Sequence, residues 1–342
     1  MRILWSRTLI ERGLLAVALA LWAGLAPAAE APAQQPACPP KAAMPAPAQL
    51  QQLAARAQDR GLLWRVRHDG HTSWLYGTMH VSRLDWFMPG PEVVKALRGA
   101  DKLALELDVL DPQVLAELEA GLKARDGAPA LSAALAARLD KQLRLACAEA
   151  DVARLRPEAQ VLSLLAQAGR RQGLDPSYGV DLILAGAARA MGKPVIGLET
   201  PQLQLKDLVS DDPKEVAEAV DDGLKQLESG KAGPMMVMLA DMWSEGRQEK
   251  LESYAQWCGC VNTPRERAQL KRMLDGRNPG MADGIASLLK QGDSVFAAVG
   301  ALHMVGPGGL PALLRKKGYQ VERVKFPVQT PPKSESKPVE TP

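Results

Sequence analysis

Two short stretches of the chain carry the residues best suited to chemistry, and they share one pattern. Trp74 to His80 and Val295 to His303 are apolar runs that each end in Gly-x-x-His. An apolar run of this length predicts a strand of an α/β sheet, whose carboxyl end opens on the crevice where ligands bind. Glycine permits a sharp turn there, so the histidine three residues later can face back over the sheet.

The two histidines also admit a purely structural interpretation. A single histidine after a strand is more often a hydrogen-bonded structural residue than a ligand. However, two of the four histidines in the chain, His80 and His303, occupy the same place in two similar units. This repetition favours a shared functional site.

The segments after the two motifs are also alike, and they predict the fold. After each histidine come a Gly/Pro-containing loop, a helical pattern and a second strand, at 92–98 and 102–109 in the first unit and at 310–317 and 319–326 in the second. We therefore expect an α/β fold with a central mixed sheet built from two βαβ units. The units should lie side by side, because each alone leaves an unpaired edge, with helical insertions at 111–192 and 201–292 packed over them. Asp69-Gly70 further predicts a hairpin turn ahead of the first motif.

Two carboxylates occupy positions where a strand is expected. Glu106 interrupts an apolar run, and Glu199 ends the short strand that begins at Pro194. A buried carboxylate needs a cation, a metal or several donors. The alternatives are an edge strand with Glu106 and Asp108 on a wet face, and a turn that begins at Glu199 before Thr200.

Arg277 and Asn278 lie in a Gly/Pro-containing loop just ahead of the last helix, which we expect at 282–290. These side chains suit binding of a substrate carbonyl or carboxylate. Equally, Asn278 precedes Pro279, which is the pattern of a helix N-cap.

The motifs that are missing narrow the chemistry. The sequence has no phosphate-binding Gly-x-x-x-x-Gly-Lys-Ser/Thr, no Gly-x-Ser-x-Gly and no His-Glu-x-x-His. Two imidazoles and a carboxylate form a divalent metal site with open positions. Such a metal lowers the pKa of bound water to roughly 7 and polarises a carbonyl group. Glu106 or Glu199 would then be a ligand or the general base.

The chain resembles the TraB/GumN family, which is related to the Tiki metalloproteases, from about Leu62 to Val324. The resemblance rests on 75–80, 105–108, 179–181, 197–200, Arg277-Asn278 with Met281, and 299–303. It implies a metal-dependent, peptidase-like fold with His80, His303 and Glu106 at the metal. Its wider relatives include erythromycin-esterase-like hydrolases and a haem- or iron-binding protein, so a shared fold does not decide the reaction.

Two functions are therefore expected as alternatives. The first is a metal-dependent hydrolase, acting on a peptide or small-molecule substrate with Mn, Co or Zn. The second is a binding protein that holds a metal or haem without turnover. The expected catalytic residues are Glu106, Glu199, Arg277 and Asn278, and the expected metal ligands are His80, His303 and Glu106.

The amino terminus predicts export. Residues 1–28 combine arginines at 2, 7 and 12, an apolar stretch at 13–25 and Ala26-Pro27-Ala28, as in a cleaved secretory signal. The alternative, an uncleaved membrane anchor, is disfavoured by the short apolar run. We expect a periplasmic or secreted protein with a Pro/Ala-rich linker at 29–47, an α/β domain at 48–326 and a disordered tail at 327–342.

An oxidising compartment allows the four cysteines to pair. Cys258-Gly259-Cys260 suits a small disulfide, or each of the two pairs with Cys38 or Cys147. A cysteine metal site lacks the usual zinc spacing.

The overall charge argues against a nucleic-acid partner. The chain has 42 Lys and Arg residues against 39 Asp and Glu residues, and only 4% aromatic residues. Neither a strong basic excess nor a base-stacking platform is present in the sequence.

Overall fold

The computed structural model describes residues 37–128 and 130–327. The predicted signal peptide, the first part of the predicted linker and nearly all of the predicted tail lie outside these residues. None of the helices formed by the described residues has the length and apolar character needed to cross a membrane.

A mixed sheet of six strands, counted over the described residues, has the order β4-β3-β5-β2-β1-β6. The strands are β1 (Leu62–His68), β2 (His71–Thr78), β3 (Lys102–Leu105), β4 (Val195–Gly197), β5 (Val295–Gly300) and β6 (Gln320–Val324). β4, β3, β5 and β2 are parallel, whereas β1 is antiparallel to both β2 and β6. The predicted α/β fold with a central mixed sheet is confirmed.

The two βαβ units are interleaved, which corrects the expected side-by-side arrangement. β5 of the second unit lies between β2 and β3 of the first and pairs with both. This order gives each apolar motif strand two hydrogen-bonded neighbours, so neither is an edge strand. Gly77 lies opposite Val299 and Thr78 opposite Gly300. Both Gly-x-x-His motifs therefore leave the sheet at the same edge, the one formed by the carboxyl ends of the parallel strands.

The hairpin that precedes the first motif is built as the sequence predicts. Asp69 and Gly70 have φ values of 48° and 82°, and two positive values in a two-residue turn match the twist of the flanking strands. The pairing places Leu62, at the start of β1, opposite Gly77. The start of β1 therefore lies at the same sheet edge as the histidine motifs.

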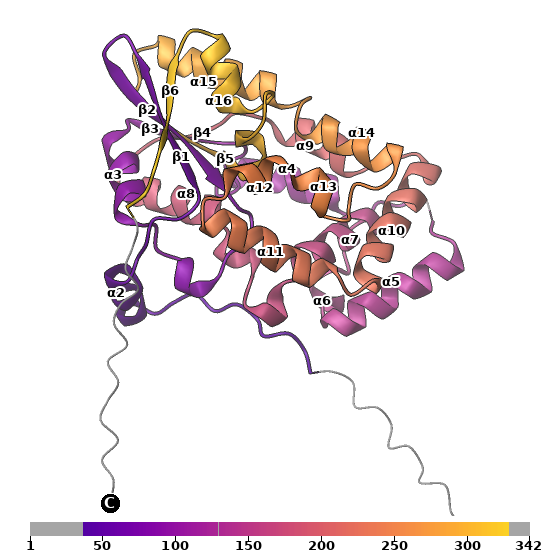
Figure 1. The fold of residues 1–342 in the computed structure, drawn as a ribbon. Coiled ribbons are helices and arrows are strands. Elements are labelled where there is room, and N and C mark those ends of the chain that lie inside the picture. The colour runs from indigo at the N-terminus through magenta and orange to yellow at the C-terminus, as the bar shows by residue number, and fades with distance from the viewer. Residues whose placement is uncertain (1–36, 129, 328–342) are drawn as a thin grey trace, which may run out of the picture. The chain divides into compact units, whose positions relative to one another are not determined.

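Helices cover both faces of the sheet (Figure 1). α3 (Pro91–Gly99) and α8 (Val180–Ala190) lie on one face, and α15 (Asn278–Lys290) and α16 (Leu310–Lys316) on the other. This division follows from right-handed crossovers. The connections that contain α3 and α8 lead across the sheet toward β4, whereas those that contain α15 and α16 lead in the opposite direction, toward β6. The resulting core is apolar and includes Leu103, Leu184, Ile285 and Phe296, all fully buried.

The expected helical insertions are present. The other described helices are α2 (Pro47–Ala55), α4 (Pro112–Leu122), α5 (Ala133–Ala146), α6 (Glu149–Val152), α7 (Pro157–Ala166), α9 (Pro201–Leu208), α10 (Pro213–Glu228), α11 (Ala232–Ser244), α12 (Gln248–Glu252), α13 (Tyr254–Trp257) and α14 (Pro264–Met273), with single 3-10 turns η1 (Leu84–Trp86), η2 (Arg170–Gln172), η3 (Pro176–Tyr178) and η4 (Ala301–Met304).

Four of these helices begin with the same local signal, a capping side chain followed by proline. The caps are Asp111, Thr200, Asp212 and Thr263, and each side chain accepts a backbone N–H of the first turn. Proline suits the first helical position because its missing N–H would have no partner there. Each cap contributes about 0.5–2 kcal/mol to helix stability.

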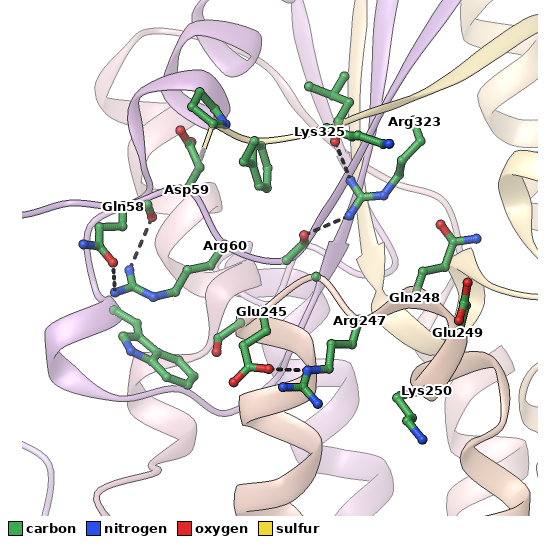
Figure 2. Close-up of a pocket in the computed structure, with 17 residues that line it drawn as sticks. Gln58, Asp59, Arg60, Glu245, Arg247, Gln248, Glu249, Lys250, Arg323 and Lys325 are labelled. Carbon is green, nitrogen blue, oxygen red and sulfur yellow. Dashed lines mark hydrogen bonds and ion pairs between the residues drawn. The ribbon is translucent and has the colours of Figure 1, made fainter. Parts of the chain in front are cut away.

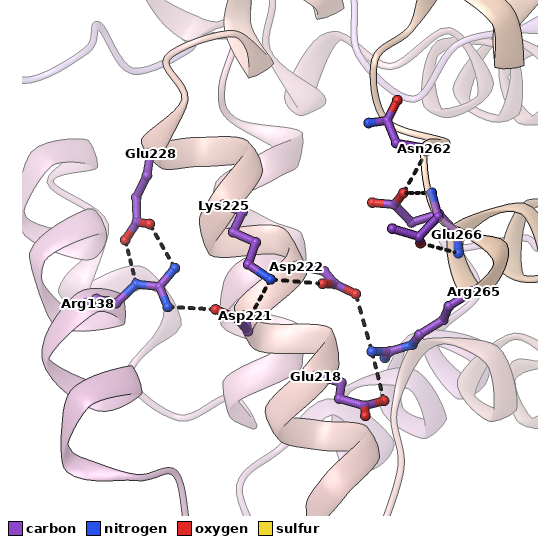
Figure 3. A network of polar contacts seen from close by, with 10 residues as sticks. Arg138, Glu218, Asp221, Asp222, Lys225, Glu228, Asn262, Arg265 and Glu266 are labelled. Atoms are coloured by element: carbon purple, nitrogen blue, oxygen red, sulfur yellow. Dashed lines mark hydrogen bonds and ion pairs between the residues drawn. The ribbon is translucent and has the colours of Figure 1, made fainter.

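α5, α7 and α10 form a second hydrophobic cluster around Leu139, Val161 and Val220. Polar contacts tie its outer surface together (Figure 3). Arg138 of α5 binds Glu228 of α10 through two nitrogens at 2.8 Å and also donates to Asp221. These partly exposed ion pairs each contribute only about 0–1 kcal/mol, so the buried apolar contacts hold the cluster.

The four cysteines form two disulfides, Cys38–Cys147 and Cys258–Cys260. A few residues after Cys38, Tyr178 Oη accepts from Ala43 N at 3.0 Å and donates to Ala43 O at 2.9 Å. The last part of the predicted linker is therefore fastened to the domain ahead of α2.

Removing the two disulfides should affect stability unequally. Replacing Cys38 and Cys147 with Ser releases a loop with a sequence separation of 109, and the free energy of unfolding should fall by roughly 4–5 kcal/mol. Cys258 and Cys260 are separated by 2, and so short a loop should contribute less than about 2 kcal/mol. Urea unfolding of the two double variants, followed by circular dichroism, measures both losses. Equal losses would show that loop closure does not determine the contribution of either bond.

Candidate functional site

Glu106 and Glu199 lie side by side just beyond β3 and β4. The ladder between these strands continues past their ends, because Leu198 N donates to Leu105 O at 2.8 Å and Glu199 N to Glu106 O at 3.0 Å. β3 is an interior strand, and Glu106 and Asp108 are 8% and 7% exposed. The alternative of a wet edge-strand face is therefore wrong, and both carboxylates of this segment need partners.

Arg277 supplies the cation for Glu106 and Glu199. Its Nη2 donates to Glu106 Oε2 at 2.7 Å, its Nε donates to Glu199 Oε1 at 2.9 Å, and its Nη2 also pairs with Glu199 Oε2. The exposed side-chain fractions are 11% for Arg277, 9% for Glu106 and 2% for Glu199. Burial acts to lower the pKa of Arg277, but the two carboxylates outweigh it and raise that pKa above its ordinary value. Arg277 thus joins the carboxylates instead of pointing freely into solvent.

The second oxygen of Glu106 is held by the backbone of the other motif. Gly300 N donates to Glu106 Oε1 at 2.7 Å. A Cβ on Gly300 would lie 3.1 Å from that oxygen and 3.6 Å from His303 Cδ2, so glycine permits the close approach. Burial acts to raise the pKa of Glu106, but the charges of His80, His303 and Arg277 and the Gly300 hydrogen bond lower it to about 2.

His303 is buried and held by Asn278. Its Nδ1 lies 2.6 Å from Asn278 Oδ1, while Asn278 Nδ2 donates to Gly308 O at 2.8 Å. Because the amide nitrogen is used by Gly308, the amide oxygen accepts, and we assign the imidazole proton to Nδ1. Nε2 of His303 is then the acceptor nitrogen. Burial lowers the pKa of His303, which favours the neutral ring.

The alternative role of Asn278 as a helix cap is not the one observed. Asn278 is the first residue of α15, and neither it nor Arg277 makes a side-chain capping bond. The side-chain oxygen of Asn278 instead contacts His303, and its side-chain nitrogen donates to Gly308 O.

His80 has an equivalent partner in Asp181, from the first turn of α8. His80 Nδ1 lies 3.2 Å from Asp181 Oδ2, and the His80 side chain is 67% exposed. The charge of Asp181 raises the pKa of His80 to about 9. Val180 N donates to Met79 O at 2.9 Å, which fixes the start of α8 beside the motif. Asp181 Oδ1 is buried without a hydrogen-bond partner among the described residues.

The site therefore gathers the predicted residues at one sheet edge, with one qualification. Both motif imidazoles and Arg277 lower the pKa of Glu106, and Asn278 contacts His303. Across residues 37–128 and 130–327, however, no three His, Cys, Asp or Glu side chains form a group that could hold a metal ion. The described conformation is a set of electrostatic partners and not a preformed ligand cage.

Two groups of this site had no role assigned from the sequence alone. Asp181 stands within the stretch 179–181 that carries the family resemblance, but its pairing with His80 spans 101 residues. Gly300 was noted as part of the motif, whereas the use of its N–H follows only from the position of β5 beside β3. An acidic residue two positions after a glycine at a helix start was the available signal for Asp181.

Replacing Arg277 with Met should destabilise the protein strongly. It would leave Glu106 and Glu199 buried without their cation, at a cost of roughly 3–5 kcal/mol in the free energy of unfolding. The matched control is Arg138→Met, which breaks ion pairs that are about one-third exposed and should cost under about 1 kcal/mol. Denaturant unfolding of both variants tests this, and similar losses would remove the structural role given to Arg277.

Comparison with known proteins assigns most of the chain to one family. Residues 62–323 match the model of the TraB/PrgY/gumN family, a range that begins with β1 and ends within β6. Comparisons with curated proteins and with solved structures found no match. The family match contains both Gly-x-x-His motifs, the two carboxylates and Arg277-Asn278, and it covers most of the chain. The chain therefore belongs to the TraB/PrgY/gumN family.

Proposed function

We propose that this chain is an exported metal-dependent hydrolase of peptide bonds, with a divalent metal held by His80, His303 and Glu106. The observation that carries the proposal is the matched anchoring of the two motif imidazoles. Asp181 binds Nδ1 of His80 and Asn278 binds Nδ1 of His303. Metal-ligating histidines are oriented in this way, with the second ring nitrogen left for the metal.

The donor set suits a divalent metal of the Mn, Co or Zn type. Neutral imidazole and carboxylate are common ligands of these ions. Burial favours the neutral ring of His303, whereas His80, with its pKa of about 9, must release a proton when it binds the metal. When bound, such an ion supplies Lewis acidity and a water that ionises near neutral pH. Of the three proposed ligands, His80 is the exposed one, so the proposal requires this side chain to be drawn in on binding.

The hydrogen bonds also separate the roles of the two carboxylates. Both oxygens of Glu199 accept from Arg277, and Oε2 also accepts from Gln204 at 3.1 Å. Glu106 lies between Arg277, Gly300 and the two imidazoles. We therefore assign ligation or proton transfer to Glu106, and we assign to Glu199 the positioning of Arg277. Asn278 serves to orient His303.

Export is part of the same proposal. It is supported by the signal-like residues 1–28 and by the pairing of all four cysteines in disulfides, which persist in oxidising compartments. The substrate class is a peptide or a small molecule, and nothing in the charge pattern favours a nucleic acid.

Metal binding should depend on both motif histidines. In purified protein titrated with Zn²⁺, Mn²⁺ or Co²⁺, His80→Ala and His303→Ala should each weaken binding by more than about 100-fold, because each removes a direct ligand and the loss of an orienting partner alone costs 10–100-fold. His71→Ala is the matched control, since His71 is exposed at the hairpin turn. Isothermal titration calorimetry and elemental analysis provide the readouts. Unchanged stoichiometry and affinity in either motif variant would refute the proposed ligand set.

Hydrolysis should require Glu106. Glu106→Gln keeps an oxygen for the Gly300 N–H but removes the charge, so cleavage of a quenched fluorescent peptide library should fall below detection while circular dichroism stays native. The metal-loaded wild-type protein is the reference. If that protein binds a metal by elemental analysis, or haem by an absorbance scan, but cleaves no peptide, the non-catalytic binding function replaces the hydrolase.

A further inference from the structure

A cavity of about 930 Å³ lies at the same sheet edge as the candidate site, but beside β1 and β6. Its walls come from residues 58–61 ahead of β1, from Trp86, from the turn between α11 and α12, and from the end of β6 (Figure 2). None of the proposed metal ligands, nor Glu199 or Arg277, lines it.

Trp243 of α11 lies between this cavity and the histidine motif. Its Nε1 donates to Gly77 O at 2.7 Å. A Cβ on Gly61 would lie 2.8 Å from the indole ring, so the ring packs directly on the backbone of a cavity-lining residue. The cavity is thus a neighbour of the candidate site with its own walls.

The lining is rich in cations. It contains Arg60, Arg247, Lys250, Arg323 and Lys325 against three acidic residues.

Two of the three acids are already engaged. Asp59 accepts from Glu92 N at 3.0 Å and from Val93 N at 3.0 Å at the start of α3, and Glu245 pairs with Arg247. With five cations against three carboxylates, the lining keeps an excess of positive charge.

Arg323 shows the imbalance most clearly. Its guanidinium donates to Leu63 O and Val324 O at 2.9 Å and to Gly61 O at 3.2 Å, and it stacks on Trp64 at 4.8 Å. These partners are neutral, and burial lowers the pKa of Arg323 to about 10. Within the described chain it has no ion pair, so its charge is uncompensated in a partly desolvated place.

Three further cations of the lining also lack an ion pair within the described residues. Arg60 donates to Gln58 O and Gln58 Oε1 at 3.3 Å and lies over Trp86 at 5.4 Å, again without a carboxylate at ion-pair distance in the described residues. Lys250 and Lys325 are exposed side chains of the lining, and no carboxylate of the described residues lies at ion-pair distance from either.

We propose that this cavity binds a ligand of small-molecule size that carries two or more carboxylate or phosphate groups. Guanidinium forks and ammonium groups form charge-assisted hydrogen bonds with both kinds of oxyanion. The volume lies within the range of small-ligand sites. The proposal is independent of the hydrolase function, because none of its residues belongs to the proposed metal site.

The test is calorimetric titration of the full exported chain at constant ionic strength. The probes are propane-1,2,3-tricarboxylate and fructose 1,6-bisphosphate, with acetate as the monovalent reference. We expect saturable one-to-one binding of at least one multivalent probe and a loss of affinity of about 10-fold or more in Lys250→Glu and in Lys325→Glu, since each reverses a charge at the site. Binding of one probe alone identifies the oxyanion as carboxylate or phosphate.

Two matched variants make the result specific. Lys271→Glu reverses the charge of an exposed lysine on α14 outside the cavity and should leave affinity within about twofold. His80→Ala should also leave it unchanged, because His80 does not line the cavity. Absence of saturable binding, an equal loss in Lys271→Glu, or loss of anion binding in His80→Ala would each overturn the proposal.

Discussion

The ion pairs of Arg277 are the contacts on which the candidate site depends. Two carboxylates just past the ends of neighbouring parallel strands lie close together in a buried setting, where they would otherwise repel each other. Arg277 binds both, and the next residue, Asn278, begins α15 and holds His303. One short segment therefore neutralises the carboxylates and orients a motif histidine.

The position of β5 makes this arrangement possible. β5 lies between β2 and β3, so its last residue, Gly300, offers an N–H to Glu106 on one side while pairing in register with Thr78 on the other. The two motifs end at one edge for the same reason. That edge carries anchored histidines over one half and a cation-lined cavity over the other, with Trp243 between them.

The elements of this fold were largely predictable from local pattern. The apolar runs before Gly77 and Gly300 and the turn at Asp69-Gly70 are short-range signals, and each gave the expected element. The interleaving of the units was not predictable, because strand order depends on pairing between segments more than 200 residues apart, such as Trp74 with Phe296. The partners of the site residues were hidden for the same reason, since Arg277 and Glu106 are 171 residues apart.

Whether the two anchored imidazoles share a metal is tested most directly by anomalous diffraction from crystals grown with Zn²⁺, Mn²⁺ or Co²⁺. We expect one anomalous peak at the sheet edge, about 2.0–2.2 Å from Nε2 of His80, from Nε2 of His303 and from a Glu106 oxygen. A metal bound elsewhere, or no peak while His80 remains turned to solvent with Asp181, would contradict the shared site.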